Sequence, residues 1–179
     1  MNRTTSTLFV MVGLPASGKT TRAKEIEEEH QALRLTPDEW MIPLFNDNDA
    51  DGKRNIIEGR FKWLALRALS HGMDVVLDFG VWAKVERTAL RALAAETGAA
   101  CELVYLEIDQ AEQRRRRDRR TAHEPALSFD ITDEDLADYR RRFAPPDVAE
   151  LSGTELDSPP VGYSSWSSWA SEWWPTSMQ

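Results

Sequence analysis

The residues with the clearest capacity for chemistry form the segment GLPASGKT at positions 13–20. Its spacing, G-x-x-x-x-G-K-T, is that of a phosphate-binding loop, in which backbone N–H groups surround the phosphates of a nucleotide. In this pattern Lys19 contacts the β- and γ-phosphates, and the Thr20 hydroxyl binds Mg²⁺. The sequence therefore predicts a bound nucleotide and Mg²⁺. The residues expected to bind the nucleotide are Gly13, Pro15, Ala16, Ser17, Gly18, Lys19, Thr20 and Thr21.

Two local elements are expected to hold this loop in place. The apolar run LFVMV at 8–12 has the length and composition of a buried strand. Residues 20–29 contain good helix formers and neither Pro nor Gly. A Gly-rich turn can match the motif by chance, but a preceding strand and a following helix are the context in which the motif binds phosphate.

A second candidate group is the carboxylate of Asp78, the last residue of the apolar run DVVLD at 74–78. In proteins with this loop, an acid at the end of a later strand supports Mg²⁺. The alternative is an aspartate that caps the next turn. We predict that Thr20 and Asp78 bind the metal ion.

A third candidate is Asp38, which lies 19 residues after Lys19 and just beyond a strand predicted at 33–36. A carboxylate at this place can accept the proton of an attacking hydroxyl group. It can equally be an acid that stabilises the first turn of a helix. The order TPDE favours a helix start here, with Thr36 as N-cap, Pro37 at the first position and Glu39 completing a capping box.

Positions 114–120 hold six arginines, interrupted by Asp118. Guanidinium groups make bidentate contacts with phosphate oxygens, so a helical lid around 114–133 can bring one or two of them over the γ-phosphate. The alternatives are a solvated charged face and an RNA-binding patch. The residues predicted to take part in catalysis are Lys19, Asp38, Arg117 and Arg120.

Strands and helices are predicted to alternate along most of the chain. The strands are expected near 8–12, 33–36, 74–78 and 101–107, and the helices at 20–29, 54–69, 84–96, 110–122 and 132–143, with loops at 41–51 and 123–130. This alternation is typical of an α/β fold with a parallel sheet between helices. Ligands in such folds bind at the carboxyl ends of the strands, so the loop, Asp38 and Asp78 are expected in one crevice.

The composition limits the class of protein. The chain has 179 residues, the length of one domain with a substantial core. Its formal net charge of −8 disfavours general nucleic-acid binding, which usually uses a basic surface. No apolar run approaches the ~20 residues of a membrane helix, and the first residues lack the pattern of a signal peptide. We therefore expect a cytoplasmic protein without membrane contact.

The composition changes near residue 149. We expect a kinase-like domain at 1–148 and a tail rich in Ser, Pro and Trp at 149–179. In the tail, Trp166, Trp169 and Trp173 fall on one helical face. The sequence leaves open whether they pack onto the domain, bind a protein partner, mediate self-association or contact a membrane, although the acidic and Ser-rich flanks disfavour an anionic membrane.

Several of these segments occur in an order that resembles a known family. The segments are GLPASGKT, TPDE at 36–39, VVLDFG at 75–80, Glu86-Arg87 and Arg117-x-x-Arg120. Together they resemble small P-loop kinases of the AAA-type ATP-binding family, similar to polynucleotide kinase, chloramphenicol phosphotransferase and zeta toxin, over about residues 6–148. The resemblance implies a P-loop NTPase fold with a five-stranded parallel sheet and a helical lid. It also implies ATP, Mg²⁺, Asp38 as general base and an arginine of the lid, 117 or 120, at the phosphates.

We therefore expect an ATP-dependent phosphotransferase that acts on a hydroxyl of a small molecule of the antibiotic, nucleoside or sugar class. Polynucleotide kinases place an arginine three residues after the base, where this chain has Met41. That departure disfavours a nucleic-acid end as acceptor. The alternatives are a polynucleotide or nucleotide-sugar kinase, suggested by the arginine cluster, and a nucleotide-dependent binding module that uses the Trp-rich tail.

Overall fold

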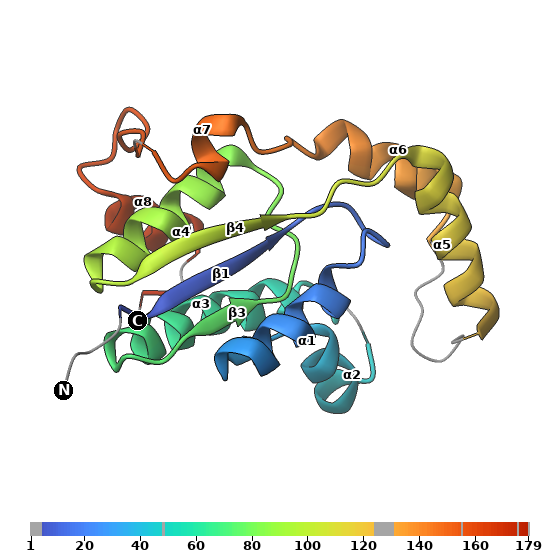
Figure 1. Ribbon diagram of the computed structural model, residues 1–179, viewed down its shortest axis with the longest axis horizontal. Coiled ribbons are helices and arrows are strands. Elements are labelled where there is room, and N and C mark those ends of the chain that lie inside the picture. The colour runs from blue at the N-terminus through green and yellow to red at the C-terminus, as the bar shows by residue number, and fades with distance from the viewer. Residues whose placement is uncertain (1–4, 48, 124–130, 155, 175, 179) are drawn as a thin grey trace.

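The centre of the molecule is a parallel sheet of four strands in the order β2-β3-β1-β4 (Figure 1). The computed structural model describes residues 5–47, 49–123, 131–154, 156–174 and 176–178. The strands are β1 (Thr7–Val12), β2 (Leu33–Leu35), β3 (Val75–Leu77) and β4 (Ala100–Tyr105). In the sheet, β1 pairs with β3 on one side and with β4 on the other, and the register sets Val10 opposite Leu77 and Leu103. The predicted α/β fold with a parallel sheet is confirmed.

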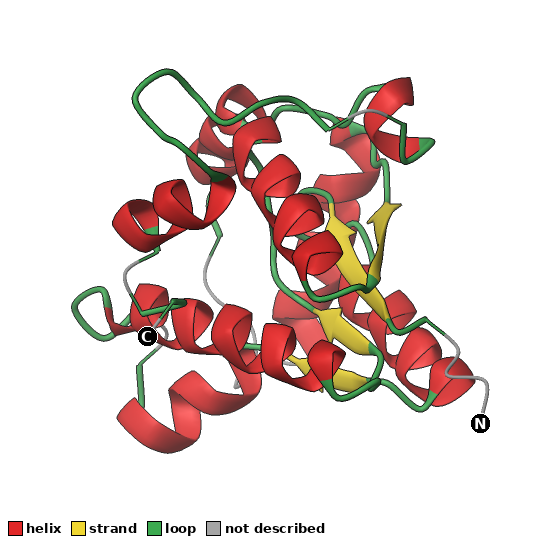
Figure 2. Cartoon of the chain, turned by 90° about the vertical axis from the view of Figure 1, so that its left-hand side faces the viewer, coloured by secondary structure: helices red, strands yellow, loops and turns green. Residues whose placement is uncertain are grey.

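Helices cover both faces of the sheet (Figure 2). They are α1 (Lys19–His30), α2 (Asp38–Phe45), α3 (Lys53–Ser70), α4 (Lys84–Glu96), α5 (Gln110–His123), α6 (Asp133–Arg142), α7 (Val148–Leu151) and α8 (Trp166–Trp173). Alternate residues of β1 serve the two faces, as the two-residue period of a strand requires. Leu8 and Val10 join a core with α3 and α4, while Phe9 and Met11 join a smaller core with α1.

The described residues form four strands, not the five that the family resemblance implied. The position beyond β4 is taken by α7, which packs against that strand. The chain reaches α7 through Pro145 and Pro146, and a proline has no N–H to donate to a strand ladder. A fifth strand is therefore not supported at this edge.

The segment after β2 differs from the prediction in two ways. Thr36 is not an N-cap, because the helix begins at Asp38 after Pro37 and has no side-chain cap. Residues 41–45, predicted as loop, continue α2 even though Pro43 lies inside it. Packing outweighs the lost backbone hydrogen bond, since Met41 is fully buried and Trp40 makes an edge-to-face contact with Phe61.

The Trp-rich segment packs onto the domain. In α8, Trp166 and Trp169 are buried, as is Trp174 just after it, and all three belong to the core that contains α3 and α4. The third predicted member of the helical face, Trp173, stacks on Trp169 but is 60% exposed. The apolar side chains of the tail thus complete the core of the domain.

A buried ion pair joins α7, which precedes the Trp-rich segment, to α4. The Arg87 guanidinium donates to both carboxylate oxygens of Glu150, at 2.8 and 3.1 Å, and neither side chain is accessible to solvent beyond 2%. Arg87 also donates to the carbonyls of Trp82 and Ala144. It therefore fixes α7 and the loop after β3, and does not face a ligand pocket. In the described part of the chain, no helix combines the length and apolarity needed to cross a membrane.

Candidate active site

The loop between β1 and α1 holds its shape through close backbone contacts. A Cβ atom on Gly13 would lie 2.7 Å from the Leu106 carbonyl oxygen and 2.8 Å from Ser17 Oγ. Only glycine fits between these atoms, so the first glycine of the motif is required for the chain to pass β4 at this distance. Ala16 and Gly18 adopt left-handed conformations, with φ of 64° and 99°. Alternating backbone conformations of this kind turn successive N–H groups toward one side, which makes an anion site.

The loop fits the phosphates of a nucleotide on two observations. Ser17 Oγ is buried and has no hydrogen-bond partner among the described residues, so a polar group is ready for a ligand. In addition, α1 begins at Lys19, which aims the free N–H groups and the positive end of the helix at the loop. Pro15, Ala16 and Gly18 are half-buried, and Thr20 and Thr21 are exposed on the first turn of α1.

Lys19 lies inside this loop. Its ammonium donates a hydrogen bond of 2.8 Å to the Leu14 carbonyl. Burial lowers its pKa from the usual 10.5 to about 8, against the opposing effect of the negative charges on Asp78 and Asp38. The cation is therefore poorly compensated without a ligand, and a phosphate placed beside it would supply the missing negative charge.

The lowered pKa predicts proton uptake on nucleotide binding. A bound phosphate favours the ammonium form and raises the pKa of Lys19, so the complex holds more protons than the free protein near pH 8. We expect the protein to take up roughly half a proton when ADP binds at pH 8. We also expect the affinity of the protein for ADP to fall as pH rises from 8 toward 10. Calorimetry in Tris and HEPES buffers at pH 8 measures the uptake. Equal binding heats in the two buffers, after correction for dilution, would contradict this prediction.

Thr20 and Asp78 meet at the base of the loop, as predicted for the metal site. The Thr20 hydroxyl donates to Asp78 Oδ1 at 3.3 Å. Asp78 is 5% exposed, and burial raises its pKa, while Arg34 and the Thr20 hydrogen bond oppose that rise. Arg34 donates to Asp78 Oδ2 at 3.1 Å, so the carboxylate is held with one oxygen toward Thr20. A hydroxyl beside a carboxylate is a donor set that suits Mg²⁺ with phosphate oxygens as its further ligands.

Asp38 lies in the first turn of α2, which begins just after the carboxyl end of β2. Its carboxylate forms an ion pair of 3.0 Å with Arg54, and about half of the side chain is exposed. Its negative charge is one of two that oppose the lowering of the Lys19 pKa by burial, so it lies near that ammonium group. The structure thus brings Lys19, Thr20, Asp78 and Asp38 to the carboxyl end of the sheet, as the sequence predicted.

The arginine-rich helix α5 lies beyond the ends of β1 and β4, together with α6 (Figure 1). Arg116 reaches the loop, where Nη1 donates to the carbonyls of Ser17 and Ala16 at 3.3 and 3.5 Å. The fully buried Gln113 donates to the Pro15 carbonyl at 3.0 Å and accepts from Arg140 of α6 at 2.9 Å. Two side chains of α5 therefore contact the loop directly.

The two arginines predicted for catalysis lie beside the loop in a different way. Arg117 donates to the Ile131 carbonyl at 2.8 Å and to Asp133 at 2.9 Å, which ties α5 to the start of α6. Arg117 and Arg120 line a small hollow with Pro15 and Ala16. Their roles at the phosphates stay predictions. Residues 124–130, the centre of the predicted loop in the lid, lie outside the described residues.

Arg116 offers a direct test of how α5 acts. Replacing it with Met removes two long hydrogen bonds to the loop and a positive charge next to the phosphates. We expect the KM for ATP to rise about fivefold to tenfold, the lower range for a charged hydrogen bond, because the side chain is half exposed. Steady-state kinetics of Arg119→Met, an exposed arginine on the same helix, provide the control. Equal effects of both changes would mean that only general charge matters.

Sequence reasoning missed three residues of this site. Arg34 has a visible signal, a charged residue between two leucines of a short strand, and its guanidinium also pairs with Glu27 and Glu39. Glu39 therefore serves Arg34 and not a capping box. Arg116 stood among the arginines, but only the rotation of α5 relative to the loop selects it. Gln113 has no signal in the sequence.

Comparison with known proteins agrees with this geometry. The sequence profile of a family described as AAA domain matches residues 8–146. Among curated proteins there is no significant match. The fold is similar to that of Kti12 from Chaetomium thermophilum in complex with ADP-AlF3, with a TM-score of 0.63 and 19% identity over 85% of this chain and 86% of that chain.

Two further solved structures share the fold. A candidate kinase from Chloroflexus aurantiacus has a TM-score of 0.57 and 18% identity, over 89% of this chain and 85% of that chain. APE1195 has a TM-score of 0.54 and 20% identity, over 80% and 82%. The profile match spans the sheet, the loop and both helices α5 and α6. The chain therefore belongs to the AAA domain family of small P-loop nucleotide-binding proteins.

Proposed function

We propose that this protein is an ATP-dependent phosphotransferase that moves the γ-phosphate to a hydroxyl group of a small molecule. The observation that carries the proposal is the half-exposed carboxylate of Asp38 at the start of α2, paired with Arg54 and near enough to Lys19 of the phosphate loop for its charge to favour the ammonium form. A carboxylate at this place can accept the proton of an acceptor hydroxyl. The family match and the likeness to a candidate kinase support the same reading.

The loop and its lysine would hold the triphosphate. Its N–H groups and the start of α1 bind phosphate oxygens, and Lys19 places a cation beside the group that is transferred. Thr20 and Asp78 would hold Mg²⁺, which would offset the negative charge of the phosphates. Arg34 orients Asp78 and opposes the rise of its pKa that burial causes.

Asp38 would act on the acceptor. Its carboxylate accepts the proton of the hydroxyl as the hydroxyl oxygen bonds to the γ-phosphorus, and the bond to the oxygen of ADP breaks. Arg54 holds the carboxylate by one ion pair and leaves part of it open to solvent. Trp40, 47% exposed and two residues away on α2, would flank the acceptor.

The test is transfer of the terminal phosphate from isotope-labelled ATP to a panel of unphosphorylated nucleosides, sugars and hydroxyl-bearing antibiotics, with products identified by mass spectrometry. A 5′-hydroxyl oligonucleotide in the same panel tests the nucleic-acid alternative. Labelled product that depends on Asp38 supports the proposal. Free phosphate as the sole product across the panel would favour a nucleotide-hydrolysing switch.

A further inference from the structure

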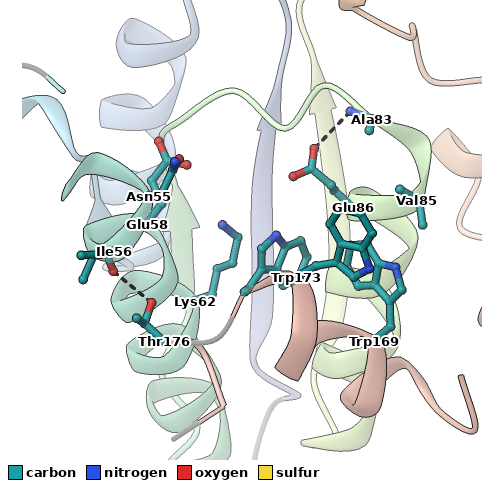
Figure 3. Close-up of a pocket in the computed structure, with 11 residues that line it drawn as sticks. Asn55, Ile56, Glu58, Lys62, Ala83, Val85, Glu86, Trp169, Trp173 and Thr176 are labelled. Carbon is teal, nitrogen blue, oxygen red and sulfur yellow. Dashed lines mark hydrogen bonds between the residues drawn. The ribbon is translucent and has the colours of Figure 1, made fainter. Parts of the chain in front are cut away.

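A cavity of about 550 Å³ lies between α3, the start of α4 and α8 (Figure 3). This volume is within the range of pockets that hold small organic ligands. The lining includes three tryptophans, two glutamates and one lysine: Trp169, Trp173, Trp174, Glu58, Glu86 and Lys62. The phosphate loop does not contribute to it, so the cavity is separate from the nucleotide site.

Two contacts connect the cavity to the acids of the candidate site, one to Asp38 and one to the segment that holds Asp78. Arg54 pairs with Asp38 at 3.0 Å and with Glu58, a cavity residue, at 3.1 Å. On the opposite side, the ring of Phe79, which directly follows Asp78, lies under the Lys62 ammonium. Arg54 thus links the cavity residue Glu58 directly to Asp38.

Lys62 gives the cavity an unusual donor. The residue is 5% exposed, and its ammonium lies 4.7 Å from the centre of the Trp174 ring and 5.1 Å from that of Phe79. No hydrogen bond to another described residue is found for it, and Figure 3 shows its nitrogen pointing between α3 and α4. Burial lowers its pKa, against the charges of Glu58 and Glu86. Its N–H groups are therefore available to a ligand that brings oxygen acceptors.

The charges of the cavity exclude one class of ligand. Glu58 and Glu86 both face Lys62, and burial raises the pKa of Glu58. Arg54 is already shared between Glu58 and Asp38. Two carboxylates against one lysine repel a phosphorylated or carboxylated ligand, whereas they accept hydrogen bonds from hydroxyl groups.

The aromatic wall comes from the C-terminal segment. Trp173 is 60% exposed and stacks on the buried Trp169, so it presents ring surface to the cavity. The segment is held on α3 by Thr176, whose hydroxyl donates to the Ile56 carbonyl at 3.1 Å. A Cβ atom on Gly59 would lie 1.8 Å from that hydroxyl, so this glycine allows the approach.

We propose that this cavity binds the acceptor, and that the acceptor is an uncharged ring compound with several hydroxyl groups, of the nucleoside or glycoside class. The inference rests on the proposed phosphotransferase function and extends it. Flat tryptophan faces bind the ring, Lys62 donates to its oxygens, and the two glutamates accept from its hydroxyls. In this arrangement the Trp-rich tail determines which acceptor binds.

Binding can be measured without ATP. Saturation-transfer NMR with unphosphorylated nucleosides in one set and methyl glycosides in another, each matched to its phosphate monoesters, probes the cavity directly. We expect members of one uncharged set to bind and their monoesters not to bind. Trp173→Ala should weaken binding about tenfold, the effect of removing an aromatic stacking partner, and Lys62→Met by a similar factor. Arg67→Met, a change of an exposed residue on α3 that does not line the cavity, is the control.

The results separate this inference from the proposed function. If the unchanged protein binds a probe, both Trp173→Ala and Lys62→Met lose that binding, and no phosphate transfer is found, the cavity assignment stands and the proposed kinase function is wrong. Transfer that is unaffected by both changes would leave the kinase and overturn the cavity assignment. Binding of monoesters in preference to uncharged compounds, or of no probe at all, would also overturn it. Lys62→Met removes a buried charge, so it remains informative if Trp173→Ala does not fold.

Discussion

Asp38→Asn is expected to lower kcat about 10²–10⁴-fold, the usual cost of removing a general base. The amide has the size of the carboxylate and its oxygen can still accept from Arg54, which pairs with Asp38 at 3.0 Å. Geometry is therefore kept while the ability to take a proton is lost. Because the loop and Lys19 hold the nucleotide, the KM for ATP should change by less than about threefold. Steady-state kinetics with the acceptor found in the transfer assay measure both values.

The matched control for Asp38 is its neighbour. Glu39→Gln changes an exposed acid on the same turn of α2, one that pairs with Arg34. This variant should keep nearly all activity. If Asp38→Asn retains its kcat, or if Glu39→Gln loses as much, Asp38 is not the base and its role is to stabilise the first turn of α2.

Lys19→Met is expected to reduce kcat/KM for ATP by at least about 10²–10³-fold, as found when one charge-stabilising donor is removed from a transition state. The ammonium lies inside the loop, 2.8 Å from the Leu14 carbonyl, where no other described lysine is placed to replace it. Methionine fills a similar volume without the charge. The change should weaken ADP binding, measured by calorimetry, without lowering the Tm of the protein.

The stability of this variant distinguishes chemistry from unfolding. Burial lowers the pKa of Lys19 to about 8, so the folded protein carries this charge at a cost at neutral pH. The cost is greatest below pH 8 and disappears as pH rises toward 10.5, where the lysine is neutral in both states. The Tm of Lys19→Met at pH 7 should therefore equal or exceed that of the unchanged protein. Lys24→Met, on the exposed side of α1, should alter neither activity nor Tm. A lowered Tm in Lys19→Met would mean that the lysine is structural.

The local parts of the site follow from the sequence. The strand, loop and helix around 13–20 are predictable because the constraints act within a few residues: a glycine where a Cβ would collide, a buried apolar strand and a helix start beyond Gly18. The order of the loop, Asp38 and Asp78 places them together, because parallel strands bring their carboxyl ends to the same edge. The parallel α/β fold is confirmed for the same reason.

Local patterns failed where packing between distant segments decides the outcome. The TPDE pattern predicted a capping box, but Glu39 pairs with Arg34 from the neighbouring strand. Pro43 predicted a loop, but burial of Met41 keeps α2 helical. The fifth strand came from the resemblance alone, and α7 packs beside β4 in its place.

The sequence by itself determined the loop GLPASGKT between a strand and a helix, with two acids near it, since those features depend on backbone geometry and strand order. Only the tertiary structure decided that Arg116 and Gln113 contact the loop, because the rotation of α5 depends on contacts about 100 residues away in the chain. It also decided that the tryptophans of the tail pack on α3 and α4. Three tryptophans at a helical spacing indicate an apolar face, but not the surface that covers it.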